Sequence, residues 1–188
     1  LTADGNEEIF QVIHLSAFLM TKILLPNLMA GSPSRVIDIN SEGHSFGGLN
    51  LKDLTWAKRL YIGLRSYGAA KTAQLLTVQE YARRLSGSGV TVNAMHPGAV
   101  RTEIGMNNGF LYRFYNRHIL RLFLKDPEIS GEAIYYLAAA PELAGISGKF
   151  FNQTIEEKPA PHAVNTLMGE KVWAVSEQLI APYLEETP

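Results

Sequence analysis

The sequence predicts a single α/β domain built on a parallel sheet with helices on both faces. The chain has 188 residues, the size of one domain, and 46% of them are hydrophobic and 19% charged, which is typical of a soluble globular protein. Helical and strand patterns alternate along the whole sequence, as they do in proteins with a covered parallel sheet. No repeat, low-complexity tract or linker divides residues 1–188.

The first predicted elements are a helix, a strand and a second helix. Glu7 and Glu8 favour a helix start by complementing the helix dipole, and the apolar run behind them continues to about Pro26 or slightly beyond. A β-branched run at 34–40 predicts a buried strand. An apolar face then predicts a helix over about 66–86, which a Gly-Ser-Gly stretch ends.

The second half continues the alternation. The stretch GVTVNAM predicts a second strand at 89–95. A capping aspartate, a first-turn proline and a first-turn glutamate predict a helix over 126–140. A short third strand is expected at 148–152, and a last helix with an apolar face at about 165–181.

Composition excludes several classes of function. The net charge is -1 and the pI is about 6.6, so no basic field favours nucleic acid. The absence of cysteine removes disulfides, thiolate metal sites and cysteine nucleophiles, and agrees with a reducing compartment such as the cytoplasm. The histidines lack the paired spacing of metal sites, so no metal is predicted; they are His14, His44, His96, His118 and His162.

The apolar stretch at 9–30 is long enough to cross a membrane. Because Gln11, His14, Lys22 and Asn27 interrupt it, we interpret it as a core helix. The residues before it lack the basic flank and small-residue cleavage site of a signal peptide, and no initiator methionine is present.

Three polar features are expected to meet at one edge of the sheet. Tyr67 and Lys71 are four residues apart, so on a helix they share a face. Ser41 follows the first predicted strand, and the stretch HPGAVRT at 96–102 follows the second. In an open parallel sheet the ligand sits at the carboxyl ends of the strands. A Tyr-x-x-x-Lys pair is a weak motif alone, but this combination predicts an active site in a single crevice.

The sequence resembles the C-terminal two-thirds of a short-chain dehydrogenase/reductase. Six segments have counterparts there in the same order: TADGNEEIFQVIHLSAFLMTKILLPNL, SRVIDINSEGH, YGAAKTAQLLTVQEYARRL, GVTVNAMHPGAVRTEI, PELAGISGKFF and VWAVSEQLI. Within the superfamily the chain is most similar to the retinol dehydrogenases and to the catalytic domain of the WW-domain-containing oxidoreductase. The resemblance implies the C-terminal part of a Rossmann-type, doubly wound parallel sheet.

The resemblance also implies catalytic roles that suit the chemistry of these residue types. Ser41 would hydrogen-bond the oxygen of a carbonyl or alcohol substrate. Tyr67 would be the general acid in reduction and the general base in oxidation. Lys71 would favour the phenolate of Tyr67 by its positive charge and hold the ribose of the nicotinamide.

The cofactor implied by the resemblance is NAD or NADP. Tyr67 and Lys71 would contact it together with a turn that matches the family pattern PGxVxT, made of Pro97, Gly98, Val100 and Thr102. The reaction would move a hydride between the nicotinamide and a carbonyl or alcohol carbon.

Two features depart from the family pattern. In the first helix the family usually has Asn in a stretch like VNHLG, where it holds a water that links the lysine to solvent; here the stretch is VIHLS, with Ile13 at that position. His14 is either a substitute in this relay or a hydrogen-bonded helix histidine. The TGxxxGxG loop that binds pyrophosphate at a helix N-terminus is also absent, and with it the first strands of the family's sheet.

The stretch 103–125 predicts an amphipathic helix with a basic stripe. In the family this region is the lid over the substrate, and Phe110, Phe114 and Tyr115 would suit a lipophilic alcohol or aldehyde. Attachment to an anionic membrane surface and a helix packed on the body with a solvated basic face are the alternatives.

Three functional hypotheses follow. The favoured one is an NAD(P)-dependent oxidoreductase, represented by its catalytic and substrate-binding part. The second is a catalytically impaired binding or dimerisation module, since Ile13 and the missing glycine loop depart from the family. In the family the first helix and the Tyr/Lys helix commonly form the subunit interface, so a homo-oligomer is expected. The third is a lipid-binding protein of the membrane surface.

Overall fold

The computed structural model describes residues 1–98 and 127–185. The predicted elements within these ranges are present, with ends shifted by a few residues. Helices and strands follow one another in the order α1 (Glu8–Phe10), η1 (Gln11–Leu15), α2 (Ser16–Ala30), β1 (Ser34–Ile39), η2 (Glu42–Phe46), α3 (Gly63–Arg84), β2 (Val90–His96), α5 (Pro127–Ala139), η4 (Pro141–Leu143), β3 (Phe150–Asn152), β4 (Ile155–Glu157), η5 (Pro161–Ala163) and α6 (Thr166–Glu185). The helix expected at 103–125 lies outside the described residues.

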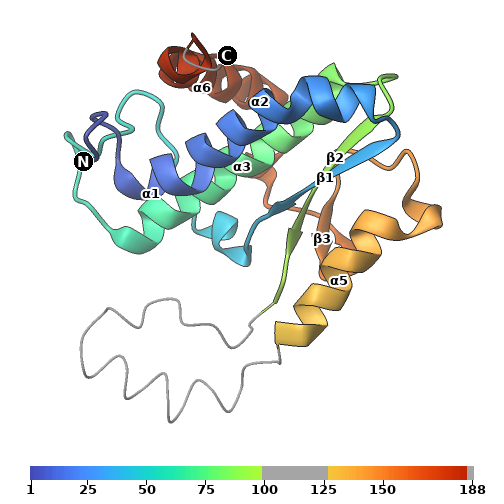
Figure 1. The fold of residues 1–188 in the computed structure, drawn as a ribbon. Helices are drawn as coiled ribbons and strands as arrows, with labels where there is room; N and C mark the ends of the chain where they lie inside the picture. Colours follow the sequence, from blue (N-terminus) through green and yellow to red (C-terminus); the bar gives the residue numbers. More distant parts are fainter. Residues whose placement is uncertain (99–126, 186–188) are drawn as a thin grey trace.

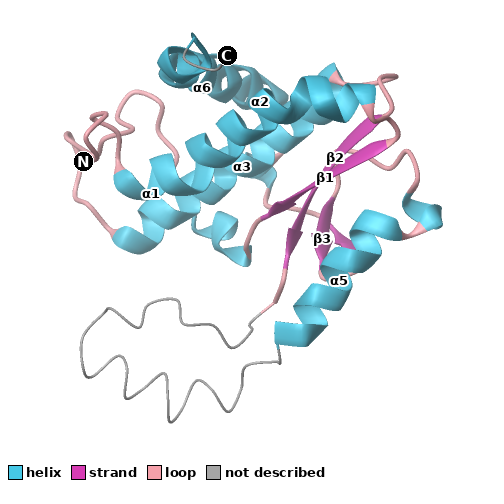
Figure 2. Cartoon of the chain, in the orientation of Figure 1, coloured by secondary structure: helices cyan, strands magenta, loops and turns pink. Residues whose placement is uncertain are grey.

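The described strands form one sheet in the order β1-β2-β3-β4 (Figure 2). β1 pairs with β2 in parallel, and β2 pairs with β3 in parallel. The parallel arrangement expected from the alternation is therefore confirmed for these strands. β4 was not predicted, and it runs antiparallel to β3 after a turn in which Gln153 has a positive φ of 55°.

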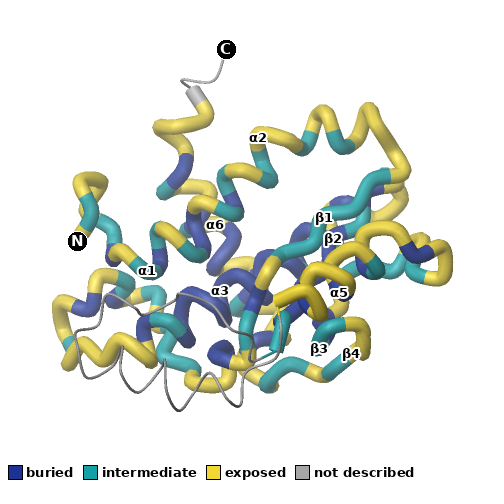
Figure 3. The backbone as a smooth tube through the Cα atoms, turned by 60° about the horizontal axis from the view of Figure 1, so that its bottom comes forward, coloured by how far each residue is buried: buried dark blue, intermediate teal, exposed yellow. Residues whose placement is uncertain are grey.

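Helices cover both faces of this sheet (Figure 1). Val92 and Ala94 of β2 belong to the larger core, which α2, α3 and α6 complete, whereas Met95 packs on the other face against Ala133 and Leu137 of α5. This alternation is the period of two that a strand covered on both sides requires. α3 is deeply buried along most of its length (Figure 3).

The first helical segment runs without interruption from Glu8 to Ala30. Glu7 caps it, because its carboxylate accepts hydrogen bonds from the N–H groups of Ile9 and Phe10. Its second turn, η1, is a π-helix. By length and composition this helix could cross a membrane. In the structure the side chains of Phe10 and Phe18 are buried in the core, whereas only 22% of the most apolar stretch of this helix is buried, so the helix contributes one face to the core.

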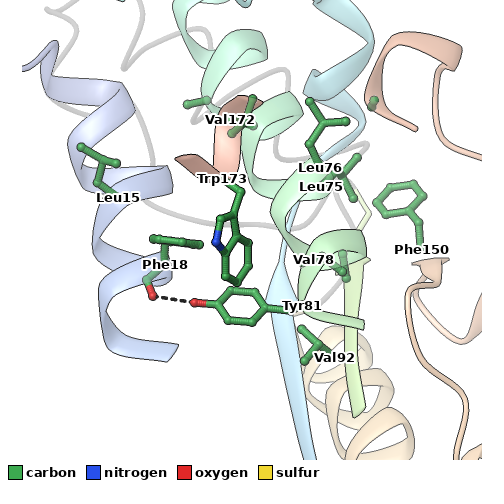
Figure 4. Packing of buried hydrophobic residues seen from close by; sticks show 14 of the residues in the cluster. Leu15, Phe18, Leu75, Leu76, Val78, Tyr81, Val92, Phe150, Val172 and Trp173 are labelled. Atoms are coloured by element: carbon green, nitrogen blue, oxygen red, sulfur yellow. Dashed lines mark hydrogen bonds between the residues drawn. The ribbon is translucent and has the colours of Figure 1, made fainter. Parts of the chain in front are cut away.

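An aromatic cluster holds α6 against α2 and α3 (Figure 4). Phe18 of α2, Tyr81 of α3 and Trp173 of α6 contact one another with ring centroids 4.6 to 5.4 Å apart, and the Tyr81 hydroxyl donates to the Phe18 carbonyl at 3.0 Å. Burial of a phenylalanine side chain contributes about 1.5–3 kcal/mol. α6 therefore covers part of the helical face that the resemblance implied as a subunit interface.

The other side of β1 has no strand partner among the described residues. A groove of about 450 Å³ runs between this edge and α2. Its walls include Met20 and Leu24 of α2 and Ile39 of β1, which are 58%, 47% and 41% exposed. An open strand edge with apolar walls favours association with another chain segment.

Candidate active site

Ser41 lies at the carboxyl end of β1, two residues beyond the strand, and caps the short helix η2. Its backbone N–H donates to Asn40 Oδ1 at 2.8 Å, and its Oγ accepts from the Gly43 N–H at 3.0 Å. A hydroxyl that accepts one hydrogen bond keeps its proton for donation. Ser41 is partly exposed, so this proton can reach a substrate oxygen.

Tyr67 and Lys71 lie one turn apart near the start of α3, as predicted. The Lys71 Nζ lies 5.9 Å from the centroid of the Tyr67 ring. Tyr67 is partly exposed, whereas Lys71 is buried. The phenol is thus placed to meet a substrate, and the ammonium lies behind it.

Gly43 brings the serine and the tyrosine together. A β-carbon at this position would lie 2.3 Å from Tyr67 Cε1 and 3.3 Å from Ser41 Oγ, so the phenol ring and the hydroxyl flank the same glycine. Gly68 allows a similar approach, since a β-carbon there would lie 2.7 Å from the Gly47 carbonyl oxygen. Sequence reasoning missed both glycines, because their value depends on how η2 packs against α3.

Lys71 donates hydrogen bonds to two neutral oxygen atoms and lies near the carboxylate of Asp38. Its Nζ donates to the Ile39 carbonyl at 2.7 Å and to Gln74 Oε1 at 3.0 Å. Burial lowers the pKa of Lys71 to about 8, and the negative charge of Asp38 opposes this shift. Burial likewise raises the pKa of Asp38 to about 7, against the effect of Lys71. An ammonium has three donors, so one N–H of Lys71 is left for a further acceptor.

Three polar residues that the sequence analysis did not single out complete the surroundings of Lys71. Gln74 Nε2 donates to Asp38 Oδ1. Asn40 Nδ2 donates to Gln74 Oε1 at 3.0 Å and to the Lys71 carbonyl at 3.1 Å. Their spacing in the sequence could have indicated them. Asp38 and Asn40 are two residues apart, so they lie on the same face of the strand, and Gln74 is three residues after Lys71, so it shares a helix face with it.

Ile13 and His14 occupy the part of the first helix where the family has an asparagine that links the lysine to solvent. Ile13 packs against the apolar core, as a core residue would. His14 is fully buried, pairs with Ser176 Oγ of α6 at 2.7 Å, and has its pKa lowered to about 3 by burial. It is therefore a neutral, hydrogen-bonded helix histidine and not a partner of Lys71.

His44 links the serine loop to the C-terminal part of the chain. Its Nε2 accepts from the Ala160 N–H at 3.0 Å, so a neutral ring carries its proton on Nδ1, which lies 2.8 Å from the Ser41 carbonyl oxygen. The His44 carbonyl in turn lies 2.9 Å from His162 Nε2. These contacts fix the backbone on which Ser41 stands.

The Pro97-Gly98 turn follows β2, as predicted, and is held from several directions. The Pro97 carbonyl accepts from Ser130 Oγ of α5 at 3.0 Å and from Gln153 Nε2 at 3.3 Å. Gly98 has a φ of 81°, which favours glycine, and its N–H donates to His96 Nδ1 at 3.0 Å. Val100 and Thr102, also assigned to the cofactor site, lie outside the described residues.

Among the described residues, Glu42, His96 and Glu157 bring potential metal ligands within 4.8 Å of one another. The His96 Nε2 lies 3.0 Å from Glu42 Oε1. Because His96 Nδ1 accepts from the Gly98 N–H, a neutral ring carries its proton on Nε2, and that nitrogen has no lone pair for a metal. The hydrogen bonding of this cluster favours a support for the Pro97-Gly98 turn over a metal centre.

Comparison with known proteins shows which proteins the chain is similar to. The chain is 41% identical to retinol dehydrogenase 13 of Homo sapiens over its whole length, and 35% identical over 96% of its length to the WW domain-containing oxidoreductase of Danio rerio. It spans 59% and 45% of these two relatives. Its fold matches the crystal structure of a putative uncharacterized protein from Mycobacterium paratuberculosis, with a TM-score of 0.66 and 29% identity, covering 95% of this chain and 60% of that one.

The sequence model of the short chain dehydrogenase family matches residues 1–109. This range contains the residues whose arrangement was described above, from Ser41 to the Pro97-Gly98 turn. The chain belongs to the short-chain dehydrogenase family.

Proposed function

We propose that the protein is an oxidoreductase that uses NAD or NADP to interconvert an alcohol and a carbonyl compound, with a lipophilic substrate. The observation that carries this proposal is the placement of the Ser41 hydroxyl and the Tyr67 ring close together at Gly43, with the buried Lys71 near the phenol ring. Membership of the short-chain dehydrogenase family supports it.

In the proposed reaction each side chain has one task. The Ser41 hydroxyl donates a hydrogen bond to the substrate oxygen. Tyr67 passes a proton to that oxygen in reduction and takes it back in oxidation. Lys71 stabilises the phenolate by its charge and offers its remaining N–H to the ribose of the cofactor. The bound nicotinamide supplies or accepts the hydride.

The donor set fits the nicotinamide end of such a cofactor. Lys71 keeps a free donor, and the Pro97-Gly98 turn stands at the carboxyl end of the neighbouring strand. The loop that would bind pyrophosphate is not in the sequence of this chain. Activity is therefore proposed for a version of the protein that includes the nucleotide-binding half.

The alternative of an impaired binding or dimerisation module has lost its main support. Ile13 is a core residue, and Lys71 donates to the Ile39 carbonyl and to Gln74 Oε1 without an asparagine at position 13. A homo-oligomer and attachment to a membrane surface stay proposals. Because α6 covers part of the α2/α3 face, an oligomer of residues 1–188 could use the rest of that face or the open edge of β1.

A lipophilic substrate is supported by the likeness to retinol dehydrogenase 13 and by the aromatic residues expected in the lid. Phe110, Phe114 and Tyr115 lie outside the described residues, so their role rests on the sequence. Replacing all three by alanine should raise the KM for long apolar aldehydes much more than for short ones, since each lost contact removes on the order of 1–3 kcal/mol of burial.

The measurement is steady-state oxidation of NADH and NADPH with straight-chain aldehydes of increasing length, in the version with the nucleotide-binding half. The unsubstituted protein should prefer the long aldehydes. Equal changes in KM for long and short aldehydes would show that the three aromatic residues have a purely structural role. Absence of turnover with every aldehyde and both cofactors would refute the proposed function.

A further inference from the structure

Asp38 lies on the same side of the sheet as the catalytic lysine. Neighbouring residues of a strand point to opposite faces of the sheet. Because Ile37 packs toward α5, the side chain of Asp38 points to the face covered by α2 and α3. There its Oδ1 accepts a hydrogen bond from Gln74 Nε2. Gln74 stands one turn after Lys71 on α3, and its Oε1 accepts from Lys71 Nζ at 3.0 Å.

The two ends of this connection fix the orientation of the amide between them. An ionised carboxylate can only accept hydrogen bonds, and an ammonium can only donate them. The Gln74 amide must therefore turn its NH₂ group toward Asp38 and its oxygen toward Lys71. A neutral group at position 38 that could also donate would leave Lys71 alone to set the orientation of the amide.

The same orientation passes on to Ser41. Because Gln74 Oε1 is an acceptor, Asn40 turns its Nδ2 toward it, at 3.0 Å. Asn40 Oδ1 is then left to accept from the Ser41 backbone N–H at 2.8 Å. A directed series of hydrogen bonds thus runs from Asp38 through Gln74 and Asn40 to the backbone of Ser41, with Lys71 attached at its middle.

We propose that Asp38 is a positioning residue for the catalytic site: through Gln74 and Asn40 it sets the hydrogen-bond directions that hold Lys71 and Ser41, and its charge keeps Lys71 in the ammonium form. This inference rests on the proposed function of Lys71. Asp38 of β1 would then support the lysine in a chain that has Ile13 at the position where the family usually has an asparagine.

The charges around Asp38 are few among the described residues. Lys71 opposes the burial that raises the pKa of Asp38 to about 7. Tyr81 of α3 has its pKa raised by burial and, further, by the charges of Glu177 and Asp38. Arg35 of β1 lines the same groove and donates to the Leu137 carbonyl at 3.1 Å. The α2 wall of the groove is made of residues that do not titrate: Ala17, Met20, Thr21, Leu24 and Leu28.

The sign of the effect on Lys71 follows from these contacts. The pKa of Lys71 is about 8 with Asp38 beside it, and the carboxylate is the group that raises it against burial. Replacing Asp38 by asparagine should lower the pKa of Lys71 further. Less of the lysine is then an ammonium at a given pH above neutrality, so activity should fall at a lower pH than in the unsubstituted protein.

The experiment compares Asp38→Asn with Asp38→Glu, which keeps the charge, and with Glu156→Gln, which removes a carboxylate on β4 at the far edge of the sheet. All are made in a version of the protein that includes the nucleotide-binding half. In Asp38→Asn the kcat should fall by about tenfold, with little change in KM, and the upper limb of the pH profile should move down by on the order of one unit. Asp38→Glu should recover part of the kcat, and Glu156→Gln should match the unsubstituted protein.

A second readout does not need turnover. The Nζ resonance of Lys71, labelled with nitrogen-15 and assigned by its loss in Lys71→Arg, reports the titration of this lysine directly. Its midpoint should lie near the pKa of about 8 and fall in Asp38→Asn. If Asp38→Asn does not fold, Gln74→Leu breaks the connection while leaving both charges, and it should lower kcat with a smaller change in the Lys71 midpoint.

The outcomes separate this inference from the proposed function. An unchanged Lys71 midpoint and pH profile in Asp38→Asn would overturn the role of Asp38, whatever the activity. If Gln74→Leu is the variant that folds, an unchanged kcat would overturn it. A midpoint that falls in a protein without turnover would refute the proposed function and still support the coupling of Asp38 to Lys71.

Discussion

Replacement of Tyr67 by phenylalanine should lower kcat by about two to four orders of magnitude, the range lost with a general acid or base. The variant removes the hydroxyl and keeps the ring, which packs against Gly43. Folding should therefore be unaffected, and KM should change little. The measurement is aldehyde reduction in a version with the nucleotide-binding half, together with the thermal unfolding midpoint. Lys71→Ala should be nearly as damaging, because the phenolate loses its nearby cation.

Tyr135→Phe is the matched control. Tyr135 lies on α5 and is 74% exposed, so loss of its hydroxyl should leave both kcat and stability unchanged. Lys71→Ala also removes the hydrogen bonds from Nζ to the Ile39 carbonyl and to Gln74 Oε1. Among the described residues Gln74 Oε1 then keeps only Asn40 Nδ2 as a donor, so a lower unfolding midpoint is expected in that variant alone. If Tyr67→Phe kept a kcat close to that of the unsubstituted protein, Tyr67 would not be the acid and base.

Residues 1–188 in isolation should bind neither NADH nor NADPH measurably and should associate. The contacts to the nicotinamide end would be present in Ser41, Tyr67 and Lys71, but the sequence has no glycine loop to hold the pyrophosphate, which ordinarily orients the dinucleotide. The open edge of β1 and the apolar groove beside it favour association. A version extended at its N-terminus by a nucleotide-binding half should bind a cofactor and associate less.

The test is a fluorescence titration of both cofactors against the isolated and extended chains, with sedimentation velocity on the same samples. The isolated chain carrying Tyr67→Phe is the control for nonspecific binding. Tight and saturable binding by the isolated chain would show that a glycine loop is dispensable in this protein. A stable monomer of the isolated chain would show that the β1 edge is not a site of association.

The order of the long elements could be predicted from the sequence because their signals are local. Glu7 begins the first helix and in fact caps it, and the apolar periodicity of α3 and α6 places both helices correctly. β4 and the π-helical turn η1 were missed for a physical reason. β4 has three residues, as β3 has, but two of them are glutamates, so it lacks the adjacent aromatic residues that mark β3. η1 differs from an α-helix only in its hydrogen bonding.

The proposed catalytic residues could likewise be found from local signals, whereas the residues that support them could not. Ser41, Tyr67 and Lys71 could be found from a strand end and one helical turn, and the structure brings them to one place. The roles of Asp38 and Gln74 could not, because they depend on how α3 lies across β1. That packing is set by contacts far apart in the sequence, among them the close approach that Gly68 permits.

The central claim is that Ser41, Tyr67 and Lys71 perform a hydride-transfer reaction on a carbonyl carbon. Transfer of deuterium from a reduced nicotinamide with both C4 hydrogens replaced by deuterium to a long-chain aldehyde tests it most directly. The alcohol formed by the version that carries the nucleotide-binding half is analysed by mass spectrometry. We expect an alcohol with deuterium on the former carbonyl carbon, and almost none over the same time in Tyr67→Phe. An alcohol without deuterium, or equal labelling by Tyr67→Phe, would contradict the claim.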